Sequence, residues 1–336
     1  MNQTTDNPID WARFQEVVDA ANTIILTSHI RPDCDALGSE LGMAMLLEQK
    51  GKQVRIVNGH ATPPNLAFID PENRIQTFGE DVQGDEINDA DLLIVLDTSA
   101  WAQLLPMQEW IQNFPGKKAI VDHHVSEDDL GAELFKNTTA EATGRLVVEC
   151  ADALGCKITP EMAMPIFAAV ATDTGWFRFP SASHGTYQVG SRLVEAGASP
   201  AGIYSELYER ETGGRIRLRG RVLSRIAVEL DGKLAHTYIL KDDYEETGAL
   251  PTDTEDLVNH CMEINGVEFA VIMIEQTTGG FKISFRSRCD VACNEVAGQF
   301  DGGGHKAAAG AFVKGEFQTV QPNVLDYVRE QLNVAV

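Results

Sequence analysis

The sequence predicts an α/β protein of two domains: an amino-terminal domain with a mostly parallel sheet flanked by helices, and a smaller carboxyl-terminal α/β domain. Two observations predict this fold class. In the amino-terminal part, short apolar runs typical of buried strands alternate with helical patterns, which is the order expected for a parallel sheet. With 336 residues the chain also exceeds one typical hydrophobic core, so a second domain is expected.

Three apolar runs in the amino-terminal domain, at residues 23–26, 91–96 and 118–121, are followed at once by acidic residues or histidines. Chance would supply one such ending, but hardly three. Ligands of open α/β sheets bind outside the carboxyl ends of the strands, so these endings mark the expected site. Around them, the sequence predicts a strand at 53–57, a loop-rich excursion at 63–84, and helices at 7–21, 36–49, 140–154, 159–171 and 183–198.

The first ending places His29, Asp33 and Asp35 on a tight connection between a strand and a helix. Imidazole together with carboxylates suits a divalent cation such as manganese or zinc better than calcium. The alternative is a polar loop in which Asp35 caps the helix that starts at Ala36. This stretch alone does not decide between the two interpretations, and its neighbours in the fold must.

Further side chains suited to metal binding lie in other segments of the same domain. Asp173 follows a helix and could simply end it, which is the commoner use of an Asp-x-Gly turn. The whole set fits a two-metal site better than a pair of carboxylates that exchange protons, because two cations can share a carboxylate and hold a phosphoryl group. Without cations, so many buried carboxylates would bind protons instead. The set comprises His29, Asp33, Asp35, Asp97, His123, His124 and Asp173.

The carboxyl-terminal part contains hairpin signals and a glycine-rich run. We expect a domain at 1–200, a charged helical linker at 201–226 and a second domain at 227–336. Strand pairs are predicted at 226–240, around Asp231-Gly232, and at 269–285, followed by a helix at 291–300. The run Gly302-Gly303-Gly304-His305 comes next. Taken without its neighbours, it would be a plain flexible turn.

Composition limits the partners. The net charge is −23, from 50 acidic and 27 basic residues, so no broad basic face is expected to bind a long nucleic acid. No apolar run approaches the roughly 20 residues that span a bilayer, and the amino terminus lacks the features of a signal peptide. The six cysteines form no C-x-x-C pair, which favours reduced thiols and a cytoplasmic protein.

Taken together, the motifs resemble those of the DHH phosphoesterase superfamily, in its branch with a DHHA1 domain. Within that branch the chain is most similar to the bacterial oligoribonucleases that also act as pAp phosphatases (pAp is 3′-phosphoadenosine 5′-phosphate). The resemblance extends over nearly the whole chain, and the combination of motifs is highly specific. The motifs are His29-x-x-x-Asp33-x-Asp35-x-x-Gly38-Ser39, Asp97, Asp122-His123-His124, Asp173-Thr174-Gly175, and Gly302-Gly303-Gly304-His305 with Ala308-Ala309-Gly310.

The resemblance implies two manganese ions in each site, with magnesium or cobalt as substitutes. It assigns His29, Asp33 and Asp97 to one ion, and Asp35, Asp97, His123 and Asp173 to the other, so that Asp97 bridges them. It places His124 beside the scissile phosphate, with Asp122 orienting a neighbouring ligand. In the second domain it implies that substrate phosphate or base is bound by Arg286, His305, the backbone of Gly302, Gly303 and Gly304, and less firmly Arg288.

The implied reaction is the hydrolysis of short oligoribonucleotides or pAp by an activated water, in a cleft between the domains. A substrate of short RNA or a nucleotide bisphosphate, no membrane partner and a homodimer are compatible with the sequence. The alternative within the superfamily is a phosphodiesterase for c-di-AMP or pApA. A family II inorganic pyrophosphatase is less favoured because it lacks the glycine-histidine run. From another class, a nucleotide-binding sensor without turnover would be expected to have lost at least one ligand.

Overall fold

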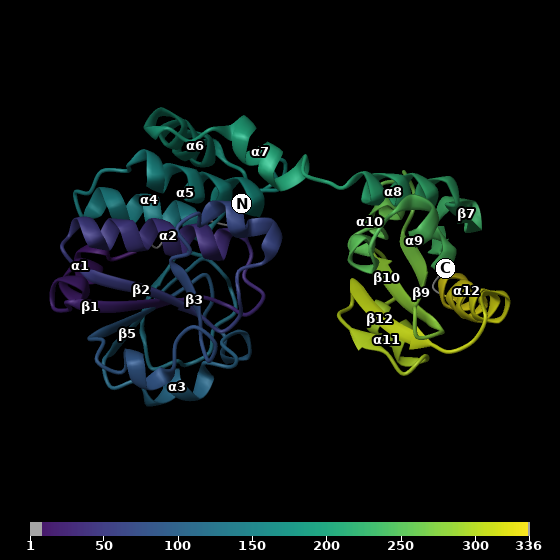
Figure 1. Cartoon of the computed structure of the whole chain (residues 1–336), viewed down its shortest axis with the longest axis horizontal. Helices are drawn as coiled ribbons and strands as arrows, with labels where there is room; N and C mark the ends of the chain where they lie inside the picture. Colours follow the sequence, from purple (N-terminus) through teal and green to yellow (C-terminus); the bar gives the residue numbers. More distant parts are fainter. Residues whose placement is uncertain (1–8, 335–336) are drawn as a thin grey trace. The chain divides into compact units, whose positions relative to one another are not determined.

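The computed structural model describes residues 9–334. The chain forms two compact units, one extending to Arg210 and the other beginning at Glu211 (Figure 1). The segment expected to be a linker is divided between them. Helix α7, Pro200–Tyr208, belongs to the first unit, and helix α8, Gly213–Ser224, packs within the second.

The first unit contains a six-stranded sheet in the order β3-β2-β1-β4-β5-β6, and every neighbouring pair of strands is parallel. The parallel arrangement confirms the predicted fold class. All five residues of β4 are buried, as expected for a central strand covered on both faces. The strands are β1 Thr23–Thr27, β2 Gln53–Asn58, β3 Ile75–Thr77, β4 Leu92–Leu96, β5 Lys117–Asp122 and β6 Glu133–Lys136.

Helices cover both faces of this sheet. On one face, α2, α4 and α5 share a core with alternate residues of the strands, such as Ile24 and Ile94. On the other, α3 packs against the residues in between, such as Ile25 and Leu93. Figure 1 shows these layers, with α3 on the side opposite α2. The helices are α1 Trp11–Asp19, α2 Cys34–Gln49, α3 Gln108–Asn113, α4 Thr143–Ala153, α5 Pro160–Asp173 and α6 His184–Ala196.

The close approach of α2 and α5 depends on a glycine. A Cβ atom at Gly38 would lie 2.3 Å from the carbonyl oxygen of Pro165, so any other residue would push the two helices apart. The first turn of α2 and the last turn of α5 carry Asp35 and Asp173. Gly38 therefore has a packing role that helps to bring these two carboxylates together.

Several sequence-based boundaries were wrong. Helix α2 begins at Cys34 and its N-cap is Asp33, whose carboxylate accepts the N–H of Ala36, whereas Asp35 lies within the first turn. Helix α4 begins at Thr143 rather than at residue 140. The strands β3 and β6 were missed because both are short edge strands with few apolar residues. The expected first helix begins at Trp11, and its predicted residues 7 and 8 lie outside the described part of the chain.

The second unit is built on a sheet in the order β11-β12-β10-β9-β8-β7, in which β8 and β9 are parallel and the other pairs antiparallel. Both predicted hairpins, β7-β8 and β9-β10, are present. The strands are β7 Ala227–Glu229, β8 Leu234–Ile239, β9 Phe269–Glu275, β10 Phe281–Ser287, β11 Gly303–Gly304 and β12 Ala308–Val313. The helices are α8, α9 Lys241–Thr247, α10 Asn259–Met262, α11 Cys293–Gly298 and α12 Phe317–Val334.

Within residues 9–334, no helix combines the length and the apolar character that crossing a bilayer would require.

Candidate metal centre

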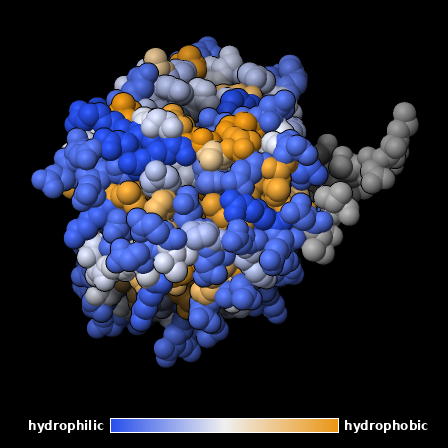
Figure 2. Space-filling model, turned by 90° about the vertical axis from the view of Figure 1, so that its right-hand side faces the viewer, coloured by the Kyte–Doolittle hydropathy of each residue, from blue (hydrophilic) through white to orange (hydrophobic). Residues whose placement is uncertain are grey.

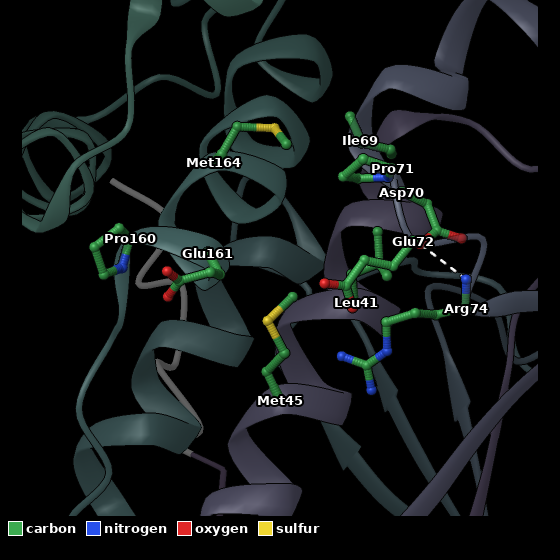
Figure 3. A pocket seen from close by; sticks show the side chains of 10 residues that line it. All are labelled: Leu41, Met45, Ile69, Asp70, Pro71, Glu72, Arg74, Pro160, Glu161 and Met164. Atoms are coloured by element: carbon green, nitrogen blue, oxygen red, sulfur yellow. Dashed lines mark hydrogen bonds between the residues drawn. The ribbon is translucent and has the colours of Figure 1, made fainter.

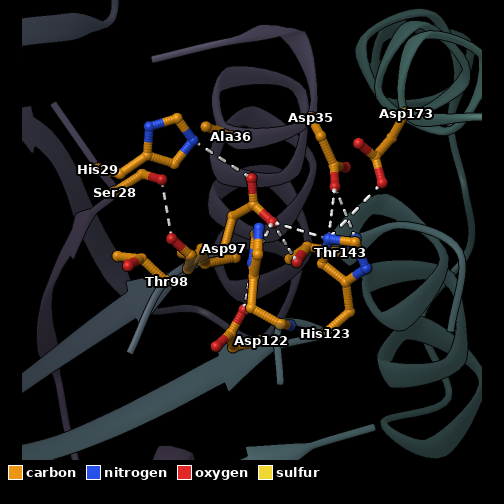
Figure 4. Close-up of polar contacts among 12 residues, drawn as sticks. Ser28, His29, Asp35, Ala36, Asp97, Thr98, Asp122, His123, Thr143 and Asp173 are labelled. Carbon is orange, nitrogen blue, oxygen red and sulfur yellow. Dashed lines mark hydrogen bonds and ion pairs between the residues drawn. The ribbon is translucent and has the colours of Figure 1, made fainter. Parts of the chain in front are cut away.

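The three strands with polar endings, β1, β4 and β5, are neighbours in the first sheet, so their carboxyl ends bring His29, Asp97 and His123 to one edge. The first turn of α2 adds Asp33 and Asp35, and the last residue of α5 adds Asp173. Figure 4 shows Asp97 between His29 on one side and His123, Asp35 and Asp173 on the other. The structure thus gathers all of the metal ligands expected from the sequence.

His29 faces two carboxylates. Its Nε2 atom lies 3.5 Å from Asp97 Oδ2 and 3.8 Å from Asp33 Oδ1. Its Nδ1 atom is 3.0 Å from the carbonyl oxygen of Ile30, which accepts a hydrogen bond from it. This bond leaves the lone pair of Nε2 directed to the carboxylates.

His123 has a similar arrangement on the other side of Asp97. Its Nε2 atom lies 3.5 Å from Asp97 Oδ1, 3.6 Å from Asp173 Oδ2 and 3.8 Å from Asp35 Oδ2. Its Nδ1 atom is 3.1 Å from the carbonyl oxygen of Ala140, the usual way in which a metal-binding histidine is oriented. The two oxygens of Asp97 therefore face two different histidines.

These distances fit atoms that share an ion. Ligand atoms about 2.1 Å from one cation lie roughly 3.0–3.6 Å apart, near the separations observed here and beyond a good hydrogen bond. Without a cation, neutral imidazoles would direct their lone pairs at carboxylate oxygens, so protons would have to take the place of the ion. Three groups of residues have ligand atoms that all lie within 4.8 Å of one another. The first is His29, Asp33 and Asp97, the second is Asp35, His123 and Asp173, and the third is Asp97, His123 and His124. The donor set fits a pair of divalent cations.

The pKa shifts within the cluster also indicate a site for cations. Burial lowers the pKa of His29, but contacts with Asp33 and Asp97 outweigh it and raise the pKa to about 11. Burial, followed by the charges of Asp97 and Asp173, raises the pKa of Asp35 well above its usual value. Burial is also the main cause that raises the pKa of Asp173 to about 6. A site with so much uncompensated negative charge binds either protons or cations.

The amino terminus of α4 holds two of the carboxylates in place. The backbone N–H groups of Thr143 and Gly144 donate to Asp35 Oδ2 and Oδ1 over 2.8 and 2.9 Å. The hydroxyl of Thr143 donates to Asp97 Oδ1 over 2.8 Å. The helix dipole adds to these bonds because its positive end faces the carboxylates. Thr143 was not predicted to be part of the site, because the predicted helix began three residues too early.

Asp97 owes its position to an unusual backbone. Its φ angle of 60° lies in the left-handed region, which aspartate tolerates better than most residues. Its N–H still donates to the carbonyl oxygen of Val121 over 3.0 Å, so the residue stays fixed to β5 just beyond the end of β4. This bend is a local strain of the kind often found at functional sites.

Asp122 is fully buried and has a partner for each side of its carboxylate. Oδ1 accepts hydrogen bonds from the backbone N–H and the Nδ1 atom of His124, over 3.0 and 2.9 Å. Oδ2 accepts a hydrogen bond from the Ser99 hydroxyl over 2.8 Å and lies 3.3 Å from the Lys136 ammonium. The Lys136 side chain is 9% exposed and also donates to Ser99 and to the carbonyl oxygen of Ser126. Lys136 is the last residue of β6, and it was not expected near Asp122 because that strand was not predicted.

His124 lies at the surface of the cluster, with 48% of its side chain exposed. Its hydrogen bond with Asp122 is the main cause that raises its pKa, and the charges of Asp97 and Asp173 add to this effect. Because Nδ1 is occupied by Asp122, Nε2 is the atom available to a substrate. The Nδ1 atom lies 3.7 Å from Asp97 Oδ1, so His124 borders the metal ligands.

The residues expected to bind substrate in the second domain lie in the second unit. Arg286 on β10 is opposite Ala308 of β12, and its side chain donates to Asn259 Oδ1 over 3.1 Å. Arg288 is exposed and donates to the carbonyl oxygen of Met262. His305 is also exposed, directly after β11.

Close packing explains why glycine occupies Gly302 and Gly304, and the sequence alone did not reveal this. Gly303 and Gly304 form the edge strand β11 beside β12. A Cβ atom at Gly302 would lie 2.3 Å from the carbonyl oxygen of Gly310, and one at Gly304 would lie 2.6 Å from the Cα atom of Ala309. The run is therefore a tightly packed strand rather than a plain flexible turn.

A hollow of about 430 Å³ opens elsewhere on the first unit, beside α2 and α5 (Figure 3). Its apolar lining includes Leu41, Met45 and Met164, and its rim carries Glu72 and Glu161. None of the candidate metal ligands lines it. The hollow is thus separate from the cluster around Asp97.

Comparisons with known proteins agree with this geometry. Residues 23–172 match the DHH family, N-terminal domain, and residues 231–333 match the DHHA1 domain. The bifunctional oligoribonuclease and PAP phosphatase NrnA of Thermus thermophilus is 29% identical, over 100% of this chain and 99% of that protein. The protein with the same description from Bacillus subtilis is also 29% identical, over 87% of this chain and 90% of its own length.

A solved structure with high similarity is an exopolyphosphatase-related protein from Bacteroides fragilis. It has a TM-score of 0.82 and 28% sequence identity, and the match covers 96% of this chain and 95% of that chain. The fold is thus shared with a protein of known structure.

Proposed function

The chain belongs to the DHH family and carries a DHHA1 domain, and on this premise we propose that it is a phosphoesterase that hydrolyses short oligoribonucleotides and pAp. One observation supports the proposal above all. The two carboxylate oxygens of Asp97 each lie 3.5 Å from the Nε2 atom of a different histidine, as expected for a carboxylate shared between two cations. The relatives described as oligoribonuclease and PAP phosphatase indicate the substrate class.

We assign two divalent cations, with manganese as the preferred metal, to the cluster. His29, Asp33 and Asp97 would hold one ion, and Asp35, Asp97, His123 and Asp173 the other. Mixed imidazole and carboxylate donors suit manganese, and magnesium or cobalt could substitute. When bound, the cations supply an activated water and neutralise the charge that develops on the phosphoryl oxygens.

The protein's own residues orient and protonate the substrate. Asp122 holds His124 by its Nδ1 atom, so Nε2 faces the solvent side of the cluster. The raised pKa of His124 favours its protonated form, which can donate a proton from Nε2 to the leaving oxygen. In the second unit, Arg286, Arg288, His305 and the backbone of Gly302–Gly304 are proposed to bind a substrate phosphate or base.

The charge of the chain favours short substrates. A net charge of −23 gives a long phosphate backbone little to bind, so each added phosphate would meet repulsion rather than release bound counterions. Positive charge would be concentrated at the cations and at a few arginines. A cytoplasmic location is part of the proposal, because the six cysteines form no C-x-x-C pair in the sequence.

A substrate panel with purified protein and Mn²⁺ tests the proposal. The panel contains pAp, RNA of two to five nucleotides, a 25-nucleotide RNA, pApA, c-di-AMP and pyrophosphate. We expect catalytic efficiency to be highest for pAp or the two- to five-nucleotide RNAs and to fall steeply with length. Absence of turnover on every phosphoester would show a binding protein instead. Equal or better efficiency on the 25-nucleotide RNA would contradict the preference for short substrates.

A further inference from the structure

The loop that follows Asp173 is fixed in an unusual conformation. Trp176 and Phe177 have φ angles of 59° and 61°, in the left-handed region that bulky residues rarely adopt. Thr174 holds the loop together, because its carbonyl oxygen accepts the N–H groups of Arg178 and Phe179, each over 3.0 Å. Backbone strain is often found at functional sites, and this loop directly follows a candidate metal ligand. We therefore ask which side chains the loop holds next to the site.

Aromatic packing fixes the inner side of the loop. The Trp176 ring lies 5.1 Å from Tyr204 and 5.8 Å from Tyr208, and Phe177 lies 5.8 Å from Phe167 of α5. These rings tie the loop to α5 and α7. The outward residues Arg178 and Phe179 are consequently held by a rigid base.

Phe179 presents an aromatic ring to solvent. The residue is 49% exposed, and its ring packs on Gly175, where a Cβ atom would lie 2.5 Å away. Gly175 has a φ angle of 55°, so glycine suits this position both sterically and conformationally. The ring is therefore fixed on one side and open on another, six residues after the metal-ligand candidate Asp173.

Arg178 supplies a cation beside this ring. Its guanidinium lies 5.9 Å from the Phe179 ring centre, and its Nε donates to the carbonyl oxygen of Gly175 over 2.8 Å. Among residues 9–334 no carboxylate within 4.0 Å pairs with it, although acidic residues outnumber basic ones 50 to 27. Its positive charge is therefore available to an anionic ligand.

Arg178 is also bonded to the two residues that follow Asp173. Its backbone N–H donates to the carbonyl oxygen of Thr174 over 3.0 Å, and its Nε donates to that of Gly175 over 2.8 Å. Arg178 is therefore anchored next to a metal-ligand candidate.

We propose that Phe179 and Arg178 form a nucleotide subsite in the first unit, in which the Phe179 ring stacks on a nucleobase and Arg178 binds a phosphate of the substrate. The inference rests on the proposed function and names the residues that would recognise its substrate. Stacking on an aromatic ring tolerates any base, because every base has a π-face. Such a subsite suits an enzyme that acts on oligoribonucleotides of any sequence.

The test compares Phe179→Ala with wild type on pAp and on an analogue of pAp that lacks adenine. Loss of one stacked base should raise KM for pAp by about 5- to 100-fold, the usual range for such contacts, with little effect on the analogue. Phe179→Tyr should restore the affinity for pAp. Arg178→Ala should raise KM for both compounds, because both carry phosphates, and Arg178→Lys should recover only part of it.

Phe312→Ala is the matched control, since Phe312 is 47% exposed but belongs to β12 of the second unit. Its KM values should equal those of wild type. An equal rise in KM for pAp and for the base-free analogue in Phe179→Ala, or no rise in either, would overturn the stacking role.

A second measurement separates the subsite from the reaction. The binding of pAp to wild type and to Phe179→Ala is measured by calorimetry with Ca²⁺ in place of Mn²⁺, to slow turnover. If wild type shows no turnover with Mn²⁺ but binds pAp in a Phe179-dependent way, the proposed function fails and the subsite stands. If wild type turns over pAp and both proteins bind it equally, the subsite fails and the function stands. If wild type neither binds nor turns over pAp, both fail.

Discussion

Replacing Thr143 by valine should weaken metal binding without disturbing the fold. The Thr143 hydroxyl is buried and donates to Asp97 Oδ1 over 2.8 Å, the oxygen that also faces His123. Valine has nearly the same shape, so the change removes this hydrogen bond and little else. The two backbone N–H donors that hold Asp35 remain.

The expected magnitude follows from the chemistry of that bond. A hydrogen bond to a charged group contributes about 1.5–3 kcal/mol. At about 1.4 kcal/mol for each factor of ten, the loss corresponds to roughly 10- to 150-fold in the affinity for Mn²⁺. Losses of about 10- to 100-fold are typical when a residue that orients a metal ligand is changed.

The assay is a calorimetric Mn²⁺ titration, supported by the Mn²⁺ dependence of turnover. Thr143→Ser keeps the hydroxyl and should restore most of the affinity. Thr186→Val is the matched control. Thr186 is equally buried, but its hydroxyl oxygen accepts the backbone N–H of Ser183 at the start of α6 instead of contacting the cluster. An unchanged Mn²⁺ affinity in Thr143→Val, or an equal loss in Thr186→Val, would refute the orienting role of Thr143.

Three further predictions concern the same cluster. Asp97→Asn should abolish turnover and reduce bound Mn²⁺ while circular dichroism shows the fold retained; wild-type turnover would exclude a shared ligand. His124→Ala should lower kcat while the bound Mn²⁺ is kept, as measured by elemental analysis, and loss of metal would make His124 a ligand instead. Lys136→Met leaves the buried Asp122 without its nearby ammonium and should destabilise the first unit by about 3–5 kcal/mol in urea unfolding, with Lys136→Arg intermediate. Equal stability of Lys136→Met and wild type would show that Ser99 and His124 suffice to hold Asp122.

Much of the first unit could be predicted because its central strands are marked by short, continuous stretches of sequence. Continuous apolar runs identified β1, β4 and β5, and the residue that follows each run identified the expected ligands. The short edge strands β3 and β6 gave no such signal, since few of their residues are buried. The partners that these strands and the start of α4 supply, such as Lys136 and Thr143, were therefore missed with them.

The glycine run illustrates a second limit of sequence reasoning. Its composition suggested either an anion-binding loop or a flexible turn, because glycine permits both. The structure adds a third reason, the close packing of Gly302 and Gly304 on β12. That reason depends on a pairing between strands, which no pattern within the run itself can show. The assignment of substrate binding to His305 and Arg286 remains a prediction.

The division between rigid and exposed parts bears on how this protein would recognise substrate. The metal-ligand candidates lie at or just beyond the ends of buried strands and helices, where packing and backbone hydrogen bonds fix them. By contrast, Arg178 and Phe179 lie on an exposed loop, and only the residues behind them are packed. Substitutions at these two positions can therefore alter affinity for the substrate while leaving the geometry around Asp97 unchanged. In this unit, the elements that position the chemistry are separate from those that would select the nucleotide.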